Sequence, residues 1–203
     1  MMKIVAGALK RDLMHGGEIE FEGKQVRYNV PRTAMKDGIA YITEDRKIEG
    51  FFDTMSIIEN IHAGLLAKKK NPVGILSLSE ARNLADEWIS ALKVRAIDPN
   101  AKIVELSGGN QQKVVIAKAL VQAPKLIIFD EPTRGVDVGA IVEIHTLINR
   151  LADEGLAVVV ISSYLPEILA LSDRILIARQ GKIVEEMKAN EATEKSVMYA
   201  AVH

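Results

Sequence analysis

Two short stretches of the 203-residue sequence hold residues whose chemistry suits phosphate groups. The first is Ser107-Gly108-Gly109, a serine and two glycines ahead of a segment with helical spacing. Such a helix start presents backbone N–H groups and the positive end of the helix dipole to an anion. The second is an apolar run, residues 126–129, that ends in Asp130 and Glu131. Two carboxylates at the carboxyl end of a buried strand predict a place for Mg²⁺ and an attacking water molecule.

A third component of many phosphate sites, the loop with the pattern G-x-x-x-x-G-K-[ST], does not occur in the sequence. That loop supplies the backbone N–H groups and the lysine that hold the phosphates of a nucleotide. The sequence therefore predicts two parts of a phosphate-handling site without the third.

Alternating strand and helix patterns must position these residues in the second half of the chain. Helices are predicted at residues 106–122, 138–154 and about 166–171, and apolar strands at 126–129 and 157–161. Continuous β-branched strands between helices predict a mainly parallel sheet with helices on both faces. A hairpin is predicted from residues 175–178 and 183–186, and a polar tail or short helix from the last ten residues.

The first half combines short elements with two helices. A helix, or the remnant of one, is predicted over residues 1–13 with Gly16-Gly17 as its stop, and then a hairpin or strand pair over 18–30. A short helix over 31–36 ended by Gly38, a strand over 39–42 and a charged loop over 43–47 follow. The capping boxes Ser56-x-x-Glu59 and Ser77-x-x-Glu80 predict two further helices. The lysine run between them, residues 68–70, predicts a solvated break.

The composition excludes several classes of protein. A net charge of −1 and an aromatic content of 4% argue against a nucleic-acid-binding surface. The sequence has no cysteine, so it has no disulfide or thiolate metal site. No apolar run approaches the roughly 20 residues that span a bilayer, and the N-terminus lacks a signal-peptide pattern. We therefore expect a cytoplasmic protein.

Together the motifs resemble those of the nucleotide-binding subunit of ATP-binding-cassette (ABC) transporters. Residues 106–109 are similar to the signature motif, Asp130-Glu131 to the end of the Walker B strand, and residues 135–137 to the D-loop. The resemblance runs from about residue 17 to residue 186. Residues 44–47, 110–113, 130–140 and 162–167 are similar to one subgroup in particular, the second cassette of the fused ATPases of ribose-, galactose- and xylose-type importers.

The resemblance implies an α/β fold of the P-loop NTPase type, with a mainly parallel sheet and a helical subdomain at about residues 48–105. In this subgroup the first helix follows directly on the phosphate loop. The resemblance therefore implies that residues 1–203 form a partial nucleotide-binding domain that lacks the phosphate-loop strand and the first cassette. A sheet without that strand would leave an apolar edge open to self-association.

The resemblance also implies roles for the motif residues. Asp130 would hold Mg²⁺ through water, and Glu131 would orient or deprotonate the attacking water. Ser107, Gly108 and Gly109, with Asn110 beside them, would bind the γ-phosphate of ATP held by the partner in a head-to-tail dimer. Without these roles, the two acids would cap the following turn, and the serine would be a plain helix cap.

Three further positions are implied to lie near the nucleotide. Glu44 stands where most cassettes carry a glutamine that reaches Mg²⁺ and senses the membrane partner; otherwise it belongs to a charged surface loop. Ser163 stands where most cassettes carry a histidine that contacts the γ-phosphate, and a serine cannot supply its positive charge. Asp137 would couple two sites across the dimer, and it is equally a good helix cap.

The implied function is that of the ATP-binding, energy-coupling subunit of a sugar importer, with ATP and Mg²⁺ as cofactors. Its implied partners are another cassette, a membrane permease and, indirectly, a periplasmic sugar-binding protein, but no nucleic acid. It would lie in the cytoplasm at the inner face of the membrane. The family hydrolyses ATP, and this chain alone, without the phosphate loop, is expected to be inactive.

Two alternatives remain open. The chain could be a truncated, non-catalytic module that binds the permease or another cassette without binding ATP alone. It could also be a soluble cassette protein of repair or translation, for which coiled-coil insertions or a more basic surface would be expected.

Overall fold

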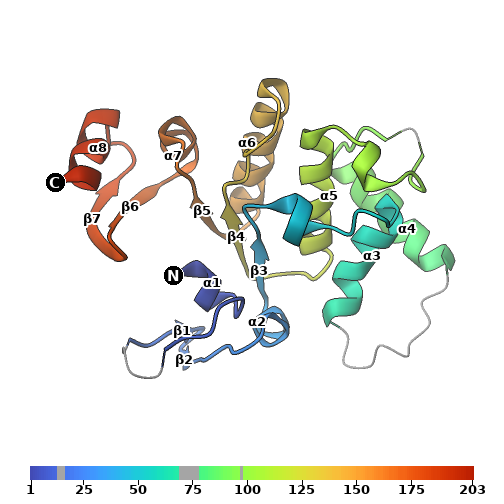
Figure 1. The fold of residues 1–203 in the computed structure, drawn as a ribbon, viewed down its shortest axis with the longest axis horizontal. Coiled ribbons are helices and arrows are strands. Elements are labelled where there is room, and N and C mark those ends of the chain that lie inside the picture. Colours follow the sequence, from blue (N-terminus) through green and yellow to red (C-terminus); the bar gives the residue numbers. More distant parts are fainter. Residues whose placement is uncertain (13–16, 69–77, 97) are drawn as a thin grey trace.

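The computed structural model describes residues 1–12, 17–68, 78–96 and 98–203. Its centre is a parallel sheet with the strand order β3-β4-β5, formed by Ile39–Ile42, Leu126–Asp130 and Ala157–Ile161 (Figure 1). The register pairs Ile39 with Leu126 and Leu126 with Ala157, so the carboxyl ends of the strands meet at one edge. The predicted parallel sheet is thus confirmed, and it brings the residues that follow β3, β4 and β5 to the same edge.

Both faces of this sheet are buried because successive side chains of a strand point to opposite faces. On one face Ile127 and Phe129 belong to the main core, together with side chains of α3 (Ile57–Lys68), α5 (Gly108–Leu120) and α6 (Val138–Asp153). On the other face Ile128 packs in a smaller cluster with Tyr28 and Ala34. β3 and β4 are therefore buried on both faces, as their unbroken hydrophobic sequences predict, whereas β5 is only half-buried.

The N-terminal elements are short. They are α1 (Met2–Val5), the hairpin of β1 (Glu20–Phe21) and β2 (Lys24–Gln25), and α2 (Pro31–Asp37). The prediction of a helix over residues 1–13 is wrong beyond Val5. Gly7 has φ +69°, and a Cβ there would lie 2.7 Å from the Val30 carbonyl oxygen, so a close backbone approach ends the helix. Gly38 ends α2 with φ 99°, as predicted.

The middle of the chain carries α3 and α4 (Leu78–Ala91), with a π-helical turn at Arg46–Gly50 and a 3₁₀ turn at Ile103–Glu105. The first capping box is confirmed, because the Ser56 and Glu59 side chains each accept a hydrogen bond from the other's backbone N–H, at 3.2 and 2.7 Å. The second capping serine, Ser77, most of the lysine run and part of the predicted Gly16-Gly17 stop lie outside the described residues.

The C-terminal region has its own small hydrophobic cluster, and α7 also packs against α6 and β5. α7 (Leu165–Leu171) leads into a hairpin of β6 (Arg174–Arg179) and β7 (Lys182–Lys188), and α8 (Glu194–Val202) follows. Ile175, Ile177, Val197 and Ala200 form its core. The hairpin is confirmed, and of the two predictions for the last residues the helix is the one found. In the described parts of the chain no helix has the length and apolar character needed to cross a bilayer.

Candidate functional site

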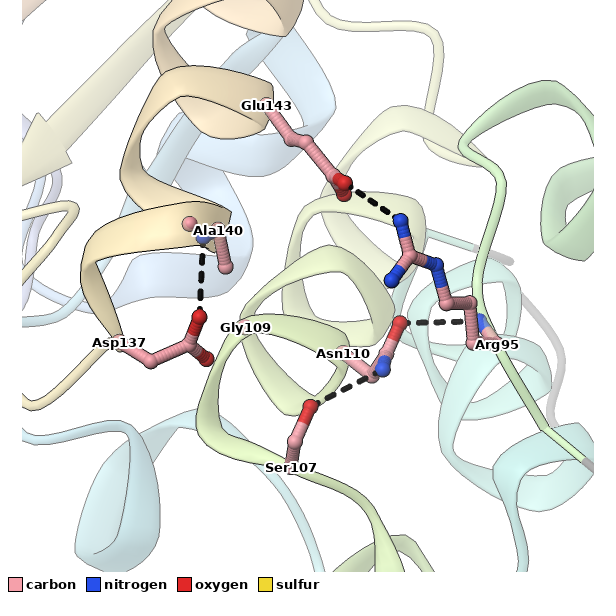
Figure 2. A pocket seen from close by; sticks show the side chains of 8 residues that line it. Arg95, Ser107, Gly109, Asn110, Asp137, Ala140 and Glu143 are labelled. Carbon is pink, nitrogen blue, oxygen red and sulfur yellow. Dashed lines mark hydrogen bonds and ion pairs between the residues drawn. The ribbon is translucent and has the colours of Figure 1, made fainter.

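The start of α5 places the Ser-Gly-Gly residues at an open pocket (Figure 2). Ser107 is the N-cap residue, and the structure shows no cap hydrogen bond from its side chain. Its hydroxyl oxygen instead accepts a hydrogen bond of 3.0 Å from the Asn110 amide. The side-chain amide oxygen of Asn110, Oδ1, in turn accepts from the backbone N–H of Arg95, at 2.9 Å. The Ser107 hydroxyl hydrogen therefore remains available to a ligand, while the oxygen is held in place.

Close packing between α5 and α6 shapes the floor of this pocket. A Cβ on Gly109 would lie 2.3 Å from the Cβ of Ala140, so the second glycine is needed for the two helices to approach. Asp137 caps α6 by accepting a hydrogen bond of 3.0 Å from the backbone N–H of Ala140. The helix-cap interpretation of Asp137 is confirmed, and the same residue also lines the pocket beside Ser107.

A charge network forms the other wall. Glu143 on α6 pairs with Lys113 at 2.6 Å and with Arg95 at 2.7 Å. Lys113 is buried and also donates to the Lys93 carbonyl oxygen at 3.1 Å. The hydrogen bond from Lys113 lowers the pKa of the Glu143 carboxyl below its usual value, with a smaller contribution from Arg95. The network ties the loop after α4 to both α5 and α6 (Figure 2).

A second, separate pocket lies at the carboxyl edge of the sheet. Glu44, Glu131, Thr133, Arg134, Ile141, Ser163 and Tyr164 line it. Arg134 forms an ion pair with Glu44, which links the ends of two chain segments that follow β3 and β4. Most of the predicted site residues thus fall into two groups: Ser107, Gly109, Asn110 and Asp137 line the first pocket, and Glu44, Glu131 and Ser163 the second. Gly108 and Asp130 line neither pocket.

Glu131 is held in a rare backbone conformation. Its φ is 50°, in the left-handed region that non-glycine residues seldom occupy. Its backbone N–H donates to the Ile161 carbonyl oxygen at 2.8 Å, and its carboxylate accepts from the backbone N–H of Ser163 at 2.7 Å. Ser163 therefore meets Glu131 through its backbone N–H, a contact that its side-chain chemistry does not predict. Strain of this kind is a common feature of functional sites.

Asp130 ends β4 and lies beside Glu131. The hydroxyl group of Tyr41 on β3 donates a hydrogen bond to the Asp130 carboxylate. Burial and, next, this hydrogen bond raise the pKa of the Tyr41 phenol above its usual value, so it remains a neutral donor. Tyr41 was not among the predicted site residues, although its position opposite Ile128 in a parallel sheet places it near the strand ends.

Of these two neighbouring carboxylates, Glu131 lines the second pocket and Asp130 does not. Mg²⁺ is often bound in proteins through one or two carboxylates, while phosphate oxygens and water supply the rest. No cluster of three or more His, Cys, Asp or Glu that could hold a metal is found among the described residues. Asp130 and Glu131 could thus supply at most one or two of the ligands of such a cation.

Sequence reasoning missed a buried cluster behind the second pocket. Glu167 is fully buried, and one of its carboxylate oxygens accepts from the Thr133 hydroxyl at 2.8 Å and lies 3.0 Å from the His145 ring. These contacts join α7 and α6 to the loop after β4. The only sequence signal was the polar type of Glu167 within an otherwise apolar short helix.

Comparisons with known proteins give one family. A family model described as ABC transporter matches residues 1–134. The ribose import ATP-binding protein RbsA of Caldanaerobacter subterraneus subsp. tengcongensis is 47% identical over 186 residues, which cover 92% of this chain and 38% of that protein. The xylose import ATP-binding protein XylG of Thermoanaerobacter pseudethanolicus is 45% identical over 185 residues, which cover 91% and 36%. The chain thus spans less than two-fifths of the length of these relatives.

Solved structures agree in fold. A dimeric ATP-binding cassette in a post-hydrolysis state, bound to ADP and Pi, superposes with a TM-score of 0.76 at 24% identity, over 93% of this chain and 78% of the other. A nucleotide-free ATP-binding cassette from an ABC transporter gives a TM-score of 0.79 at 22% identity, over 100% and 78%. At these identities the likeness concerns the fold alone.

Proposed function

Because this chain belongs to the ABC transporter family and has the fold of its ATPase cassettes, we propose that it is the ATP-binding, energy-coupling part of a sugar importer. The predicted family and fold are confirmed. The names of its relatives, which are ribose and xylose import ATP-binding proteins, support a pentose or a related monosaccharide as the cargo.

The observation that carries the mechanism is the division of the site residues between two pockets. One pocket offers the Ser107 hydroxyl and the start of α5, and the other offers Glu131 beside Asp130. A nucleotide bound at either pocket alone would meet only half of these groups. We propose that each pocket completes an ATP site whose phosphate-binding loop belongs to another cassette or chain segment, with the two cassettes arranged head to tail.

In this arrangement each group has a defined task. The start of α5 and the Ser107 hydroxyl bind the γ-phosphate and stabilise the negative charge that grows on it during hydrolysis. Asp130 holds Mg²⁺ through water, and Glu131 orients the attacking water. Asn110 keeps the Ser107 oxygen in place and does not itself need to reach the nucleotide.

The further partners follow from the same proposal. A membrane permease docks on the segment between β3 and α3, where Ile48 and Phe52 are exposed apolar side chains, and on the helices α3 and α4. The chain then lies in the cytoplasm at the inner face of the membrane. A periplasmic sugar-binding protein acts only through the permease.

A two-step measurement tests the proposal. Calorimetric titration of the chain alone with a Mg²⁺–ATP analogue should show no binding tighter than about 1 mM, which corresponds to about −4 kcal/mol. Mixing the chain with a loop-bearing cassette whose own signature serine is disabled should then produce ATP hydrolysis. Ser107→Glu should abolish that hydrolysis by charge repulsion, whereas Ser90→Glu, at an exposed serine of α4, should not.

Two results would overturn this account. Saturable binding at micromolar concentrations by the chain alone would reveal a complete phosphate site. Hydrolysis that is absent on mixing, or that survives Ser107→Glu, would show that this chain does not supply the signature group, and would favour a non-catalytic interaction module.

A further inference from the structure

Arg46 is a buried arginine whose side chain crosses between two loops. Only 7% of the residue is exposed. Its guanidinium group donates hydrogen bonds to two consecutive backbone carbonyl oxygens, those of Arg134 at 2.5 Å and Gly135 at 2.8 Å. Burial lowers the pKa of this guanidinium, yet an arginine remains charged at physiological pH. Both bonds are therefore charge-assisted, and such bonds are stronger than neutral ones.

The same guanidinium also lies against the start of α5. A Cβ added to Gly108 would be 2.8 Å from the Arg46 Nη2 atom and 2.7 Å from the Gly135 carbonyl oxygen. Gly135 itself has φ +67°, a conformation that favours glycine. Three segments thus meet at Arg46 without spare room: the turn after β3, the loop before α6 and the Ser-Gly-Gly helix start.

The turn that carries Arg46 is fixed at several points. The Asp45 side chain accepts hydrogen bonds from the backbone N–H groups of Lys47 and Ile48, at 3.1 and 3.2 Å. Lys118 on α5 donates to the Gly50 carbonyl oxygen at 2.9 Å and lies over the Phe52 ring at 4.8 Å. Asn60 on α3 bonds to both backbone groups of Phe52, at 2.8 and 3.0 Å. A displacement of this turn is therefore transmitted through Arg46 rather than absorbed by the turn.

We propose that Arg46 is a positioning residue that holds the loop 134–137 against the start of α5 and makes the two pockets move as one unit. Its loop lies between Arg134, which lines the second pocket, and Asp137, which lines the first. Arg46 lines neither pocket, so its effect acts through the backbone it binds. What the pockets bind rests on the proposed function; the mechanical role of Arg46 does not.

Hydrogen exchange of the chain itself tests the mechanical role. Arg46→Gln should accelerate amide exchange about tenfold or more across residues 134–140, since the two lost charge-assisted bonds are what hold the backbone of Arg134 and Gly135 in place. Arg46→Lys keeps the charge but cannot donate to both carbonyls in the same fork geometry. Its exchange rate at residues 134–140 should therefore lie between that of the wild type and that of Arg46→Gln. Arg174→Gln, at an exposed arginine paired with Glu186 in the β6–β7 hairpin, should leave exchange in these residues unchanged.

A second variant covers the case in which Arg46→Gln fails to fold. Gly108→Ala pushes on the same junction and should likewise accelerate exchange at residues 134–140. In the mixed ATPase assay, Arg46→Lys should lower kcat with the KM for ATP unchanged within about twofold. If the mixed assay shows no hydrolysis, the proposed function fails while the exchange result still stands. Unchanged exchange at residues 134–140 in folded Arg46 and Gly108 variants would overturn the assignment of Arg46.

Discussion

The contact between Gly109 and Ala140 sets how closely α5 can approach α6, and it can be tested by adding one methyl group. The Cβ of Gly109→Ala would lie 2.3 Å from the Ala140 Cβ, at least about 1.2 Å short of the ~3.5 Å at which two carbon atoms attract each other. The partner atom is a Cβ fixed to a helix backbone, so it cannot rotate away. The two helices must therefore separate.

The size of the effect follows from two opposing contributions. Overpacking of this kind costs about 1–3 kcal/mol. Alanine favours a helix over glycine by up to about 1 kcal/mol, which offsets part of that cost. Because the contact of 2.3 Å is far below contact distance, the overpacking cost should lie in the upper part of that range, at about 2–3 kcal/mol. Gly109→Ala should therefore lower the free energy of unfolding by about 1–2 kcal/mol. Ala140→Gly alone should cost about 1 kcal/mol, but it removes the opposing methyl, so the double variant should unfold with nearly the wild-type free energy.

Urea unfolding provides the assay, followed by circular dichroism and by the fluorescence of Trp88, the single tryptophan, which packs against the main core. Gly139→Ala is the matched control. It also adds a methyl near the start of α6, but its nearest neighbour, an Asp137 carboxylate oxygen, is 3.6 Å away, so it should be neutral or stabilising. Wild-type stability for Gly109→Ala, or additive effects in the double variant, would refute the close approach of the two helices.

Two further perturbations address single side chains at the site. Tyr41→Phe removes the donor to Asp130 but keeps the ring, so in urea unfolding it should lower the free energy of unfolding by about 1 kcal/mol. Tyr164→Phe, at an exposed tyrosine, should have little effect, and an equal loss in both variants would argue against the bond from Tyr41 to Asp130. The pKa of the Glu143 carboxyl is lowered chiefly by Lys113, so its ionised form stabilises the folded state. This stabilisation is complete above the unfolded-state pKa of about 4.3 and is lost as the pH falls through the lowered pKa of the folded state. In urea unfolding the stability difference between wild type and Glu143→Gln should be constant from pH 5 to 7 and shrink below about pH 4, and a difference that persists at pH 3 would contradict this assignment.

The sequence predicted the scaffold well where local patterns determine it. β4 and β5 follow from unbroken apolar runs, and α6 from apolar positions at helical spacing that end at Gly155. The Ser56–Glu59 capping box is a contact over three residues, so spacing alone reveals it. The helix predicted over residues 1–13 failed because apolar spacing takes no account of Gly7, whose conformation is set by a distant backbone segment.

The contacts that organise the site could not be predicted in this way. Arg46 lies in a run of charged residues that is typical of a surface loop, yet it is buried because its partners are 88 and 89 residues away in the sequence. Glu167 and Thr133 meet over 34 residues for the same reason. Such pairs depend on which strands are neighbours in the sheet, and the order β3-β4-β5 is not written in any local pattern.

The position of the loop after β4 predicts that the two pockets will be difficult to change independently. Thr133 and Arg134 line one pocket, and Asp137, three residues after Arg134, lines the other. Within this span the backbone N–H of Val136 donates to the Thr133 carbonyl oxygen at 3.1 Å, so the loop is a closed turn rather than a slack connection. Packed segments of this kind shift between discrete arrangements instead of bending gradually. A ligand that moves one end of the turn must therefore move the other end, and with it the α6 cap that faces Ser107.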